Sequence, residues 1–319
     1  MSQKPKLFIA ESLDFNKDVL EMLKEYSEVI TNDVYNEFNL SSILTDNDIF
    51  WFRLGYKIDE KVLNKSSKCR TLVTPVTGLD HIDENLCNEL GVEIISLRGE
   101  SEFLKEVRAT AEMTLALTLA LLRNLIPANN SVLDGEWDRD EFRGREVYKK
   151  NVGIIGVGRL GKISAEYFKA LGANVTGYDP REDFPDNINR ADSLKSLVEN
   201  SDIVLLHLKL DETTINLIDK VELSWFKKGA ILINTSRGGV LNEDALLDVL
   251  KSEKLAGAAL DVIKGENEIL DDNALIKYAK ENSNLLITPH IGGNTFESFE
   301  KTERFIAEKL IQRIKSIYV

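Results

Sequence analysis

The chain has 319 residues, a hydrophobic fraction of 43% and a formal net charge of −13. This length suffices for two domains of ordinary size, and the acidity argues against a nucleic-acid partner, whose binding needs a basic surface. The two cysteines, Cys69 and Cys87, form neither a metal-type cluster nor a disulfide framework, so we expect no metal and a reducing, cytoplasmic location. The N-terminus does not resemble a signal peptide, and the longest apolar run, residues 113–122, is too short to span a membrane.

The first hundred residues are predicted to alternate between strands and helices. Helical patterns cover residues 16–26 and 83–90, and strand-like segments lie at 6–10, 49–53, 71–74 and 92–96. Strands that alternate with helices predict a parallel sheet with helices on both faces. A long helix is expected next, at about 110–124.

The middle of the chain predicts a second α/β series. Its expected strands lie at 152–155, 174–178, 203–208, 230–234, 256–262 and 285–288. Six strands in this alternation predict a doubly wound dinucleotide-binding fold. A final helix at 297–317 has no strand after it and is expected to return to the first domain.

This order predicts that one domain is inserted into another. We expect a substrate domain formed by residues 1–101 and 289–319, and a dinucleotide domain formed by residues 102–288. A cleft between two such domains is the usual place for a ligand.

A glycine motif follows the first strand of the inserted domain. Gly156 permits a tight turn, Gly158 lets a pyrophosphate approach the backbone, and Gly161 allows the next helix to pack closely on the strand. Arg159 and Leu160 complete the loop. The helix N-terminus then offers N–H groups and a partial positive charge to the phosphates.

The next strand ends in Tyr178 and Asp179, and Asp179 lies 18 residues after Gly161. A carboxylate here accepts hydrogen bonds from the ribose hydroxyls and repels a 2′-phosphate, which favours NAD. Arg181 leaves NADP open, because its guanidinium could pair with that phosphate. His207 ends the following strand and is expected on the adenine side.

Three later strands also end in residues that can carry chemistry. Arg237 and Asp261 follow two of these strands, Glu266 comes five residues after Asp261, and His290 follows the last one. In open α/β sheets, ligands bind outside the carboxyl ends of the strands. We therefore expect these four side chains at one site.

With these motifs, the chain resembles the D-2-hydroxyacid dehydrogenases, a family that includes 3-phosphoglycerate dehydrogenase and the glyoxylate/hydroxypyruvate reductases. The resemblance covers nearly the whole chain and rests on Thr77–Asp83, Ala111–Glu112, Gly156–Gly161, Asn234–Gly238, Asp261–Glu266 and Pro289–Gly292. It implies a Rossmann NAD domain inserted into a flavodoxin-like substrate domain, both of them doubly wound parallel sheets.

The resemblance also implies the roles of the site residues. His290 would exchange a proton with the substrate oxygen, Glu266 would bind its other ring nitrogen, and Arg237 would bind the substrate carboxylate. The backbone at Val76, Thr77 and Gly78 would also receive that carboxylate. The implied cofactor contacts are Gly156, Gly158, Arg159, Leu160, Gly161, Tyr178, Asp179, His207, Thr235, Ser236, Asp261, Gly292 and Gly293.

The substrate is less closely defined. Arg53 matches an arginine of the phosphoglycerate dehydrogenases and favours an anionic distal group, but a second arginine of that subgroup is missing around residues 74–78. Positive charge could instead come from the atypical segment 97–108, which also reads as an ordinary solvated helix start. Asn267 replaces the proline usual after Glu266. Only 29 residues follow His290, so no regulatory domain is expected there.

We therefore expect an NAD-dependent dehydrogenase for a small 2-hydroxy or 2-oxo acid, resembling phosphoglycerate dehydrogenase. A glyoxylate/hydroxypyruvate or D-lactate-type reductase is the alternative, and an NAD-sensing protein similar to the corepressors of this fold is an alternative of another class. The resemblance further implies a homodimer through the NAD domain, which the apolar helix at 113–122 and Trp137 would support. No membrane partner is expected.

Overall fold

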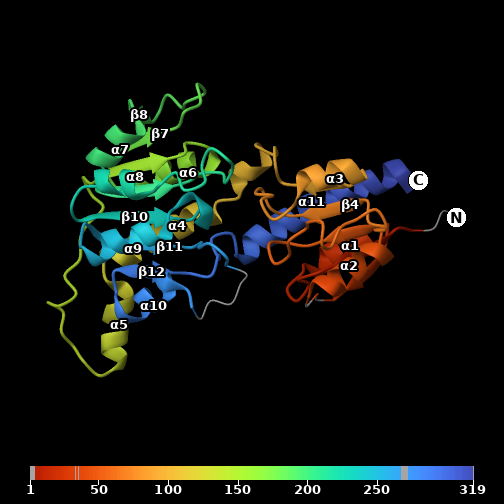
Figure 1. Ribbon diagram of the computed structural model, residues 1–319, viewed down its shortest axis with the longest axis horizontal. Coiled ribbons are helices and arrows are strands. Elements are labelled where there is room, and N and C mark those ends of the chain that lie inside the picture. The colour runs from red at the N-terminus through yellow and green to blue at the C-terminus, as the bar shows by residue number, and fades with distance from the viewer. Residues whose placement is uncertain (1–3, 33, 35, 267–271, 319) are drawn as a thin grey trace. The chain divides into compact units, whose positions relative to one another are not determined.

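The computed structural model describes residues 4–32, 34, 36–266 and 272–318; Asn267 lies outside the described residues. The chain divides into unit 1, Met1–Val107 with Thr295–Val319, and unit 2, Arg108–Asn294 (Figure 1). The boundaries between the two units lie at 107/108 and 294/295. The domain boundaries predicted from the sequence are 101/102 and 288/289. The shift has a structural cause, since Leu104 and Val107 pack in the core of unit 1, and Asp261 of unit 2 binds the backbone of Ile291 and Gly292.

Unit 1 contains a five-stranded parallel sheet in the order β2-β1-β3-β4-β5. This is the order of the flavodoxin-like doubly wound fold. The strands are β1 (Lys6–Ile9), β2 (Glu28–Thr31), β3 (Ile49–Trp51), β4 (Thr71–Thr74) and β5 (Glu93–Ser96). The strand β2 is not among the predicted ones; it lies at the edge of the sheet, and its side chains are mostly exposed.

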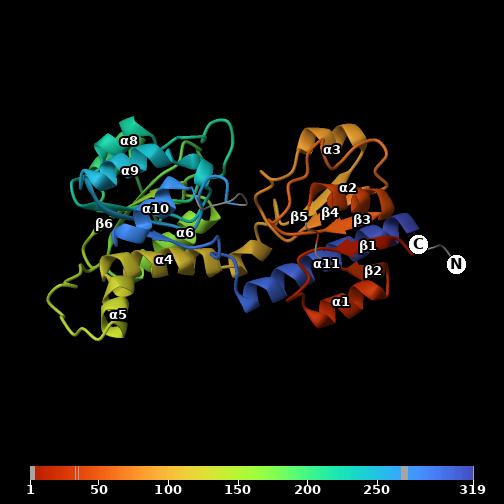
Figure 2. The same cartoon turned by 60° about the horizontal axis from the view of Figure 1, so that its bottom comes forward.

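Helices cover both faces of the unit 1 sheet (Figure 2). On one face, α1 (Lys17–Lys24) and α11 (Phe296–Tyr318) pack on β1, β3 and β5 together with the short 3₁₀ helix η1 (Phe103–Glu106). On the other face lie α2 (Glu37–Asp46) and α3 (Glu84–Leu90). The final helix therefore completes the core of the first domain, as the sequence analysis expects.

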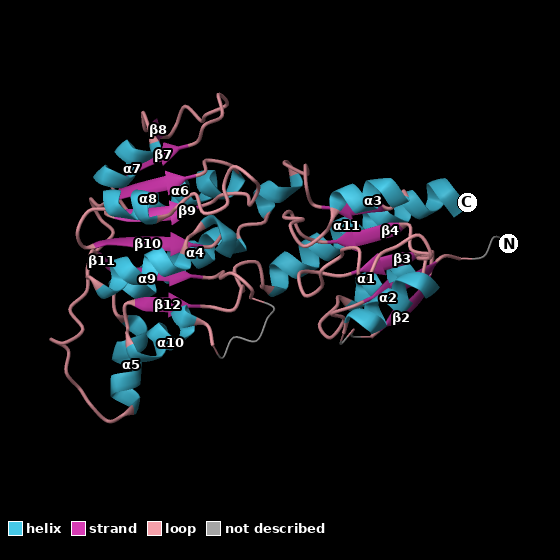
Figure 3. Ribbon diagram, in the orientation of Figure 1, coloured by secondary structure: helices cyan, strands magenta, loops and turns pink. Residues whose placement is uncertain are grey.

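Unit 2 contains a seven-stranded parallel sheet in the order β12-β11-β10-β9-β6-β7-β8 (Figure 3). The strand order reverses beside β6, which places the switch point of a Rossmann sheet at the glycine motif. The strands are β6 (Asn151–Ile155), β7 (Asn174–Tyr178), β8 (Asn189–Arg190), β9 (Ile203–Leu206), β10 (Ala230–Asn234), β11 (Leu255–Leu260) and β12 (Leu285–Ile287). The exposed two-residue β8 is the strand that the sequence analysis misses.

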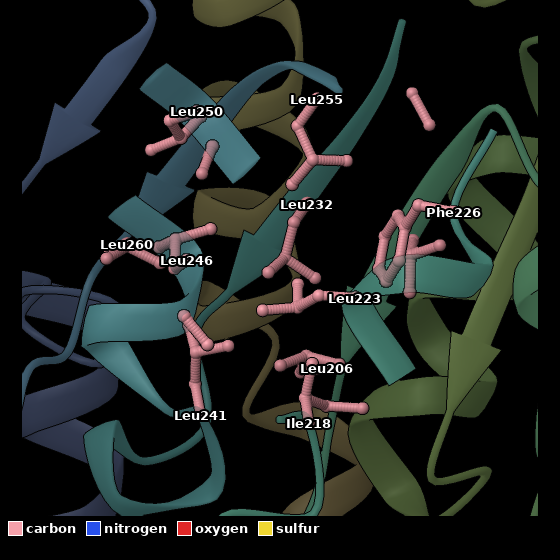
Figure 4. Packing of buried hydrophobic residues seen from close by; sticks show 14 of the residues in the cluster. Leu206, Ile218, Leu223, Phe226, Leu232, Leu241, Leu246, Leu250, Leu255 and Leu260 are labelled. Carbon is pink, nitrogen blue, oxygen red and sulfur yellow. The ribbon is translucent and has the colours of Figure 1, made fainter. Parts of the chain in front are cut away.

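Two layers of helices enclose this sheet. One layer contains α7 (Leu194–Asn200), α8 (Lys220–Trp225), α9 (Glu243–Lys251) and α10 (Ala274–Glu281). Figure 4 shows its core, where Leu206, Leu232 and Leu260 of the strands meet Leu223, Leu246 and Leu250 of the helices. The other layer contains α4 (Ala109–Leu122) and α6 (Arg159–Ala170). The remaining elements of unit 2 are α5 (Leu125–Leu133) and the 3₁₀ helix η2 (Gly238–Val240).

Within the described residues, no single helix is long and apolar enough to cross a membrane. Phe103–Leu122 and Leu125–Leu133 reach that length and apolar composition only together, and the chain is bent by 60° at the break between them.

Candidate active site

The glycine motif forms the turn from β6 into α6. Gly156 has a φ of +91°, and a Cβ there would lie 2.3 Å from the carbonyl oxygen of His207. A Cβ on Gly161 would lie 2.2 Å from the carbonyl oxygen of Gly156. At Gly158, by contrast, the nearest atom to a Cβ would be 3.7 Å away, on Arg181. No side chain caps the start of α6, and the space beside Gly158 is open, so an anionic ligand can approach the N-terminus of this helix.

Asp179 follows β7 and is buried. Its carboxylate accepts hydrogen bonds from the backbone N–H of Val157 at 2.9 Å and from Arg181 Nε and Nη2 at 2.9 and 2.8 Å. Burial raises the pKa of Asp179, but these hydrogen bonds outweigh it and hold the pKa below its usual range. Arg181, the residue that left NADP open, is thus the ion-pair partner of Asp179. Arg190, which the sequence analysis does not single out, donates to the carbonyl oxygens of both residues.

His207 lies beneath the glycine turn, with its Nε2 2.9 Å from Ser164 Oγ of α6. Burial and the positive charge of Arg159 lower the pKa of His207 to about 4, so its ring is neutral at pH 7. Burial also lowers the pKa of Arg159. A neutral ring with one nitrogen on Ser164 is suited to a structural or cofactor-lining role rather than to proton transfer near neutral pH.

His290 and Glu266 form a close pair. His290 Nδ1 lies 2.6 Å from Glu266 Oε1, and the two side chains are 22% and 30% exposed. With a proton on Nδ1 donated to the carboxylate, Nε2 is left as the nitrogen that can exchange a proton with a ligand. Both groups are close enough to solvent to be reached by a small molecule.

The backbone of His290 is held in the left-handed region, with a φ of +53°. Its N–H donates to the carbonyl oxygen of Asp261 at 2.8 Å. The carboxylate of Asp261, which is 1% exposed, accepts from Thr288 Oγ1 at 2.6 Å and from the N–H groups of Ile291 and Gly292 at 2.9 and 2.7 Å. Backbone strain of this kind persists only where the surroundings impose it. Asp261, which the resemblance assigns to the cofactor, is in this structure the anchor of the loop that carries His290.

Arg237 follows β10 and is half-buried, with Nη1 2.9 Å from the carbonyl oxygen of Ser236. The next residue must be small, because a Cβ on Gly238 would lie 2.1 Å from the carbonyl carbon of Ile263. Since β10, β11 and β12 are parallel neighbours, Arg237, Asp261 and His290 follow them at one edge of the sheet, as the sequence analysis expects of strand ends.

The other predicted cofactor contacts in unit 2 lie around these strand ends. Tyr178 is half-buried at the end of β7, and Leu160 lies in the first turn of α6. Thr235 Oγ1 is 2.7 Å from Thr114 Oγ1, and Ser236 Oγ donates to Asn234 Oδ1 at 2.8 Å.

The two glycines after His290 differ in their surroundings. Gly292 is buried with no room for a Cβ, which would lie 2.8 Å from Asp261 Oδ2, whereas Gly293 is exposed.

The predicted substrate residues of unit 1 follow two adjacent strands. Arg53 follows β3, and the segment Val76–Gly78 follows β4; Thr77 is exposed, whereas Val76 and Gly78 are half-buried. The guanidinium of Arg53 pairs with the carboxylate of Glu303 and lies over the ring of Phe299. The site around Arg53 therefore includes side chains of α11 that the sequence analysis does not identify.

A signal for Glu303 exists in the sequence. The buried face of α11 includes Thr302, Ile306, Ala307 and Leu310, and Glu303 lies on the same face by helical spacing. A charged residue on an apolar face needs a partner. That the partner is Arg53, 250 residues away, follows only from the fold.

The basic side chains of the segment 97–108 form ion pairs with glutamates. Arg98 pairs with Glu84 at 2.6 Å, Lys105 with Glu102 at 2.7 Å and Arg108 with Glu166 at 3.3 Å. All three pairs are largely exposed. This arrangement agrees with the reading of the segment as a solvated helix start.

Comparisons with known proteins identify the family of the chain. Residues 115–292 match the model of the D-isomer specific 2-hydroxyacid dehydrogenase family, NAD binding domain. The D-3-phosphoglycerate dehydrogenase of Methanocaldococcus jannaschii is 32% identical over 96% of this chain, which spans 56% of that protein. The chain thus covers about half the length of several phosphoglycerate dehydrogenases that it matches.

Other relatives match over nearly their whole length. The glyoxylate reductase of Thermofilum pendens is 30% identical and matches over 98% of this chain and 92% of its own. Among solved structures, the D-lactate dehydrogenase of Aquifex aeolicus, complexed with NAD and lactic acid, has a TM-score of 0.80. It is 28% identical, with 98% of this chain and 94% of that chain covered. On the family match and the shared fold, the chain belongs to the D-isomer-specific 2-hydroxyacid dehydrogenases, and unit 2 contains their NAD-binding domain.

Proposed function

We propose that this protein is an NAD-dependent dehydrogenase that interconverts a small D-2-hydroxy acid and the corresponding 2-oxo acid. The observation that carries the proposal is the pair of His290 and Glu266, 2.6 Å apart. His290 lies in a loop that the buried Asp261 holds in place. Arg237 follows β10, at the same carboxyl end of the sheet as the residues that follow β11 and β12. Family membership and the open approach to Gly158 support the cofactor assignment.

The proposed mechanism assigns one task to each side chain. Bound NAD supplies the hydride chemistry. During reduction His290 Nε2 donates its proton to the carbonyl oxygen of the substrate, and during oxidation it takes the proton back from the hydroxyl. Glu266 holds Nδ1–H and stabilises the imidazolium, while the planar guanidinium of Arg237 binds the substrate carboxylate through two hydrogen bonds.

A substrate panel tests this function. Purified protein should oxidise NADH with at least one of glyoxylate, hydroxypyruvate, 3-phosphohydroxypyruvate and pyruvate, as followed by absorbance. The named relatives act on several such acids, so the panel also separates the phosphoglycerate-type, glyoxylate/hydroxypyruvate-type and D-lactate-type alternatives. Tight NADH binding with no turnover on any acid would instead favour the NAD-sensing, corepressor-like alternative.

We expect Asp179→Ala to shift the cofactor preference towards NADPH by about tenfold or more, which is about 1.4 kcal/mol of differential binding. The variant removes the acceptor for the ribose hydroxyls and frees Arg181, now paired with Asp179 at 2.8 Å, to meet a 2′-phosphate. Fluorescence titration with NADH and NADPH measures both dissociation constants. Asp183→Ala, at an exposed position of the same loop, is the control, and an unchanged NADH/NADPH ratio in Asp179→Ala would refute the assignment.

We also propose a homodimer formed through the NAD domain. Exposed apolar side chains gather on and just after α5: Leu125, Ile126, Val132, Leu133 and Trp137, the last 87% exposed. Patches of this kind mark interaction surfaces. We expect light scattering after gel filtration to give twice the mass of one chain for the wild type, and one chain mass for a Leu133→Glu, Trp137→Glu double variant. Ile215→Glu, at another exposed apolar position of unit 2, should stay dimeric; a monomeric wild type would contradict the proposal.

A cytoplasmic location is part of the same proposal. It is supported by Cys69 and Cys87, which are buried, unpaired thiols of the kind that a reducing compartment maintains.

A further inference from the structure

The guanidinium of Arg53 makes an ion pair with one side chain of α11 and a cation–π contact with another. Its Nη2 pairs with Oε1 of Glu303, whose side chain is 1% exposed, and its guanidinium carbon lies 3.9 Å from the centre of the Phe299 ring. The second oxygen of Glu303 accepts the backbone N–H of Asn16 at 3.0 Å. Glu303 is therefore fixed from two sides, and Arg53 is fixed by Glu303.

A second carboxylate lies beside Arg53. Glu11 follows β1, the strand next to β3, and its Oε2 accepts the backbone N–H of Arg53 at 2.7 Å. One guanidinium and two carboxylates have a formal sum of +1 − 1 − 1 = −1. At the carboxyl ends of these two strands, Arg53 is thus flanked by two carboxylates, although it matches an arginine that favours an anionic group.

The pair between Arg53 and Glu303 is not easily opened by a ligand. A phosphate group that took over the guanidinium would leave the buried carboxylate of Glu303 without a counter-ion, which is strongly unfavourable. The phosphate would also approach the carboxylate of Glu11 and meet its repulsion. A small uncharged group meets neither penalty.

We propose that Glu303 determines substrate specificity by neutralising Arg53, so that the protein acts on 2-hydroxy and 2-oxo acids whose distal group has no negative charge. This inference rests on the proposed function and narrows its substrate class. It excludes phosphorylated acids such as 3-phosphohydroxypyruvate as the preferred substrates. Glu303 acts here through Arg53 and is a positioning residue, not a catalytic one.

The first test compares hydroxypyruvate with 3-phosphohydroxypyruvate, which differ only in the phosphate. The wild type should favour hydroxypyruvate in kcat/KM by about tenfold or more. Glu303→Gln keeps the shape but removes the charge, and it should shift the ratio of kcat/KM for the phosphorylated acid to kcat/KM for hydroxypyruvate by about tenfold towards the phosphorylated acid, mainly through KM. Adding Arg53→Ala to Glu303→Gln should abolish that shift. Glu300→Gln, at an exposed position of the same helix, is the matched control.

A binding measurement keeps the test independent of turnover. Thermal shift with 3-phosphoglycerate and with D-glycerate, each with NADH present, should show no added stabilisation of the wild type by the phosphate, and a clear gain in Glu303→Gln. A wild type that prefers the phosphorylated compound in either assay would overturn the inference while leaving the proposed function intact. Absence of turnover on the whole panel would refute the proposed function, while the thermal shifts would still decide the role of Glu303.

Discussion

His290→Asn is expected to lower kcat by about 10²–10⁴-fold, the usual contribution of a general acid–base group. Asparagine has no group that exchanges protons near neutral pH, whereas the imidazole of His290 is oriented by Glu266 at 2.6 Å. Affinity for NADH should stay within about twofold, since the glycine motif and Asp179 are untouched. Steady-state kinetics and NADH fluorescence titration, made on the same preparation, separate the two effects.

Two companion variants sharpen this prediction. Glu266→Gln retains a hydrogen-bond acceptor but loses the negative charge that stabilises the imidazolium, so a smaller fall in kcat, about 10–100-fold, is expected. Glu281→Gln, at an exposed position of α10, should have no effect. A His290→Asn enzyme with normal kcat would rule out the proposed proton transfer.

Asp261→Ala is expected to affect both stability and catalysis. The variant leaves the N–H groups of Ile291 and Gly292 and the hydroxyl of Thr288 without the carboxylate they bind at 2.6–2.9 Å. Because the site is buried, the free energy of unfolding should fall by about 2–5 kcal/mol. The loop that holds His290 at a positive φ should relax as well, so kcat should fall even at temperatures where the variant is fully folded.

Urea unfolding followed by circular dichroism measures the first effect, and kinetics well below the melting temperature measure the second. Asp248→Ala, at an exposed position of α9, is the control for the loss of a carboxylate in unit 2. If Asp261→Ala kept its stability while cofactor affinity collapsed, the residue would be a cofactor ligand first, as the family resemblance implies, and not the anchor of the loop.

Most of the fold could be predicted because the buried strands are strongly patterned. The strand 174–178 lies in the structure with the predicted bounds, as does 230–234, since each is a short β-rich run between turn residues. The two missed strands, β2 and β8, lie at sheet edges and are mostly exposed. Without a buried face, a strand has little hydrophobic alternation to reveal it.

The residues of the candidate site could be predicted where they directly follow a predicted strand. Arg237 and His290 follow strands, and strand ends can be recognised from local pattern. The partners of these residues depend on tertiary contacts instead. Nothing local indicates that Asp261 holds the backbone of Gly292, or that a helix near residue 303 neutralises Arg53. Such contacts join segments that are far apart in the sequence, and the hydrophobic periodicity of a segment does not predict them.

The placement of α11 has a consequence for how the chain folds during synthesis. Unit 2 is one uninterrupted stretch, Arg108–Asn294, so all its strands have been translated before α11 begins. Unit 1 needs Ile306, Leu310 and Ile314 to fill its core, and these residues follow the whole of unit 2 in the chain. Domains tend to fold as units while the chain emerges. We therefore expect unit 2 to fold before unit 1. Until α11 has been synthesised, the five-stranded sheet keeps one apolar face partly uncovered, and that face is a surface to which chaperones bind.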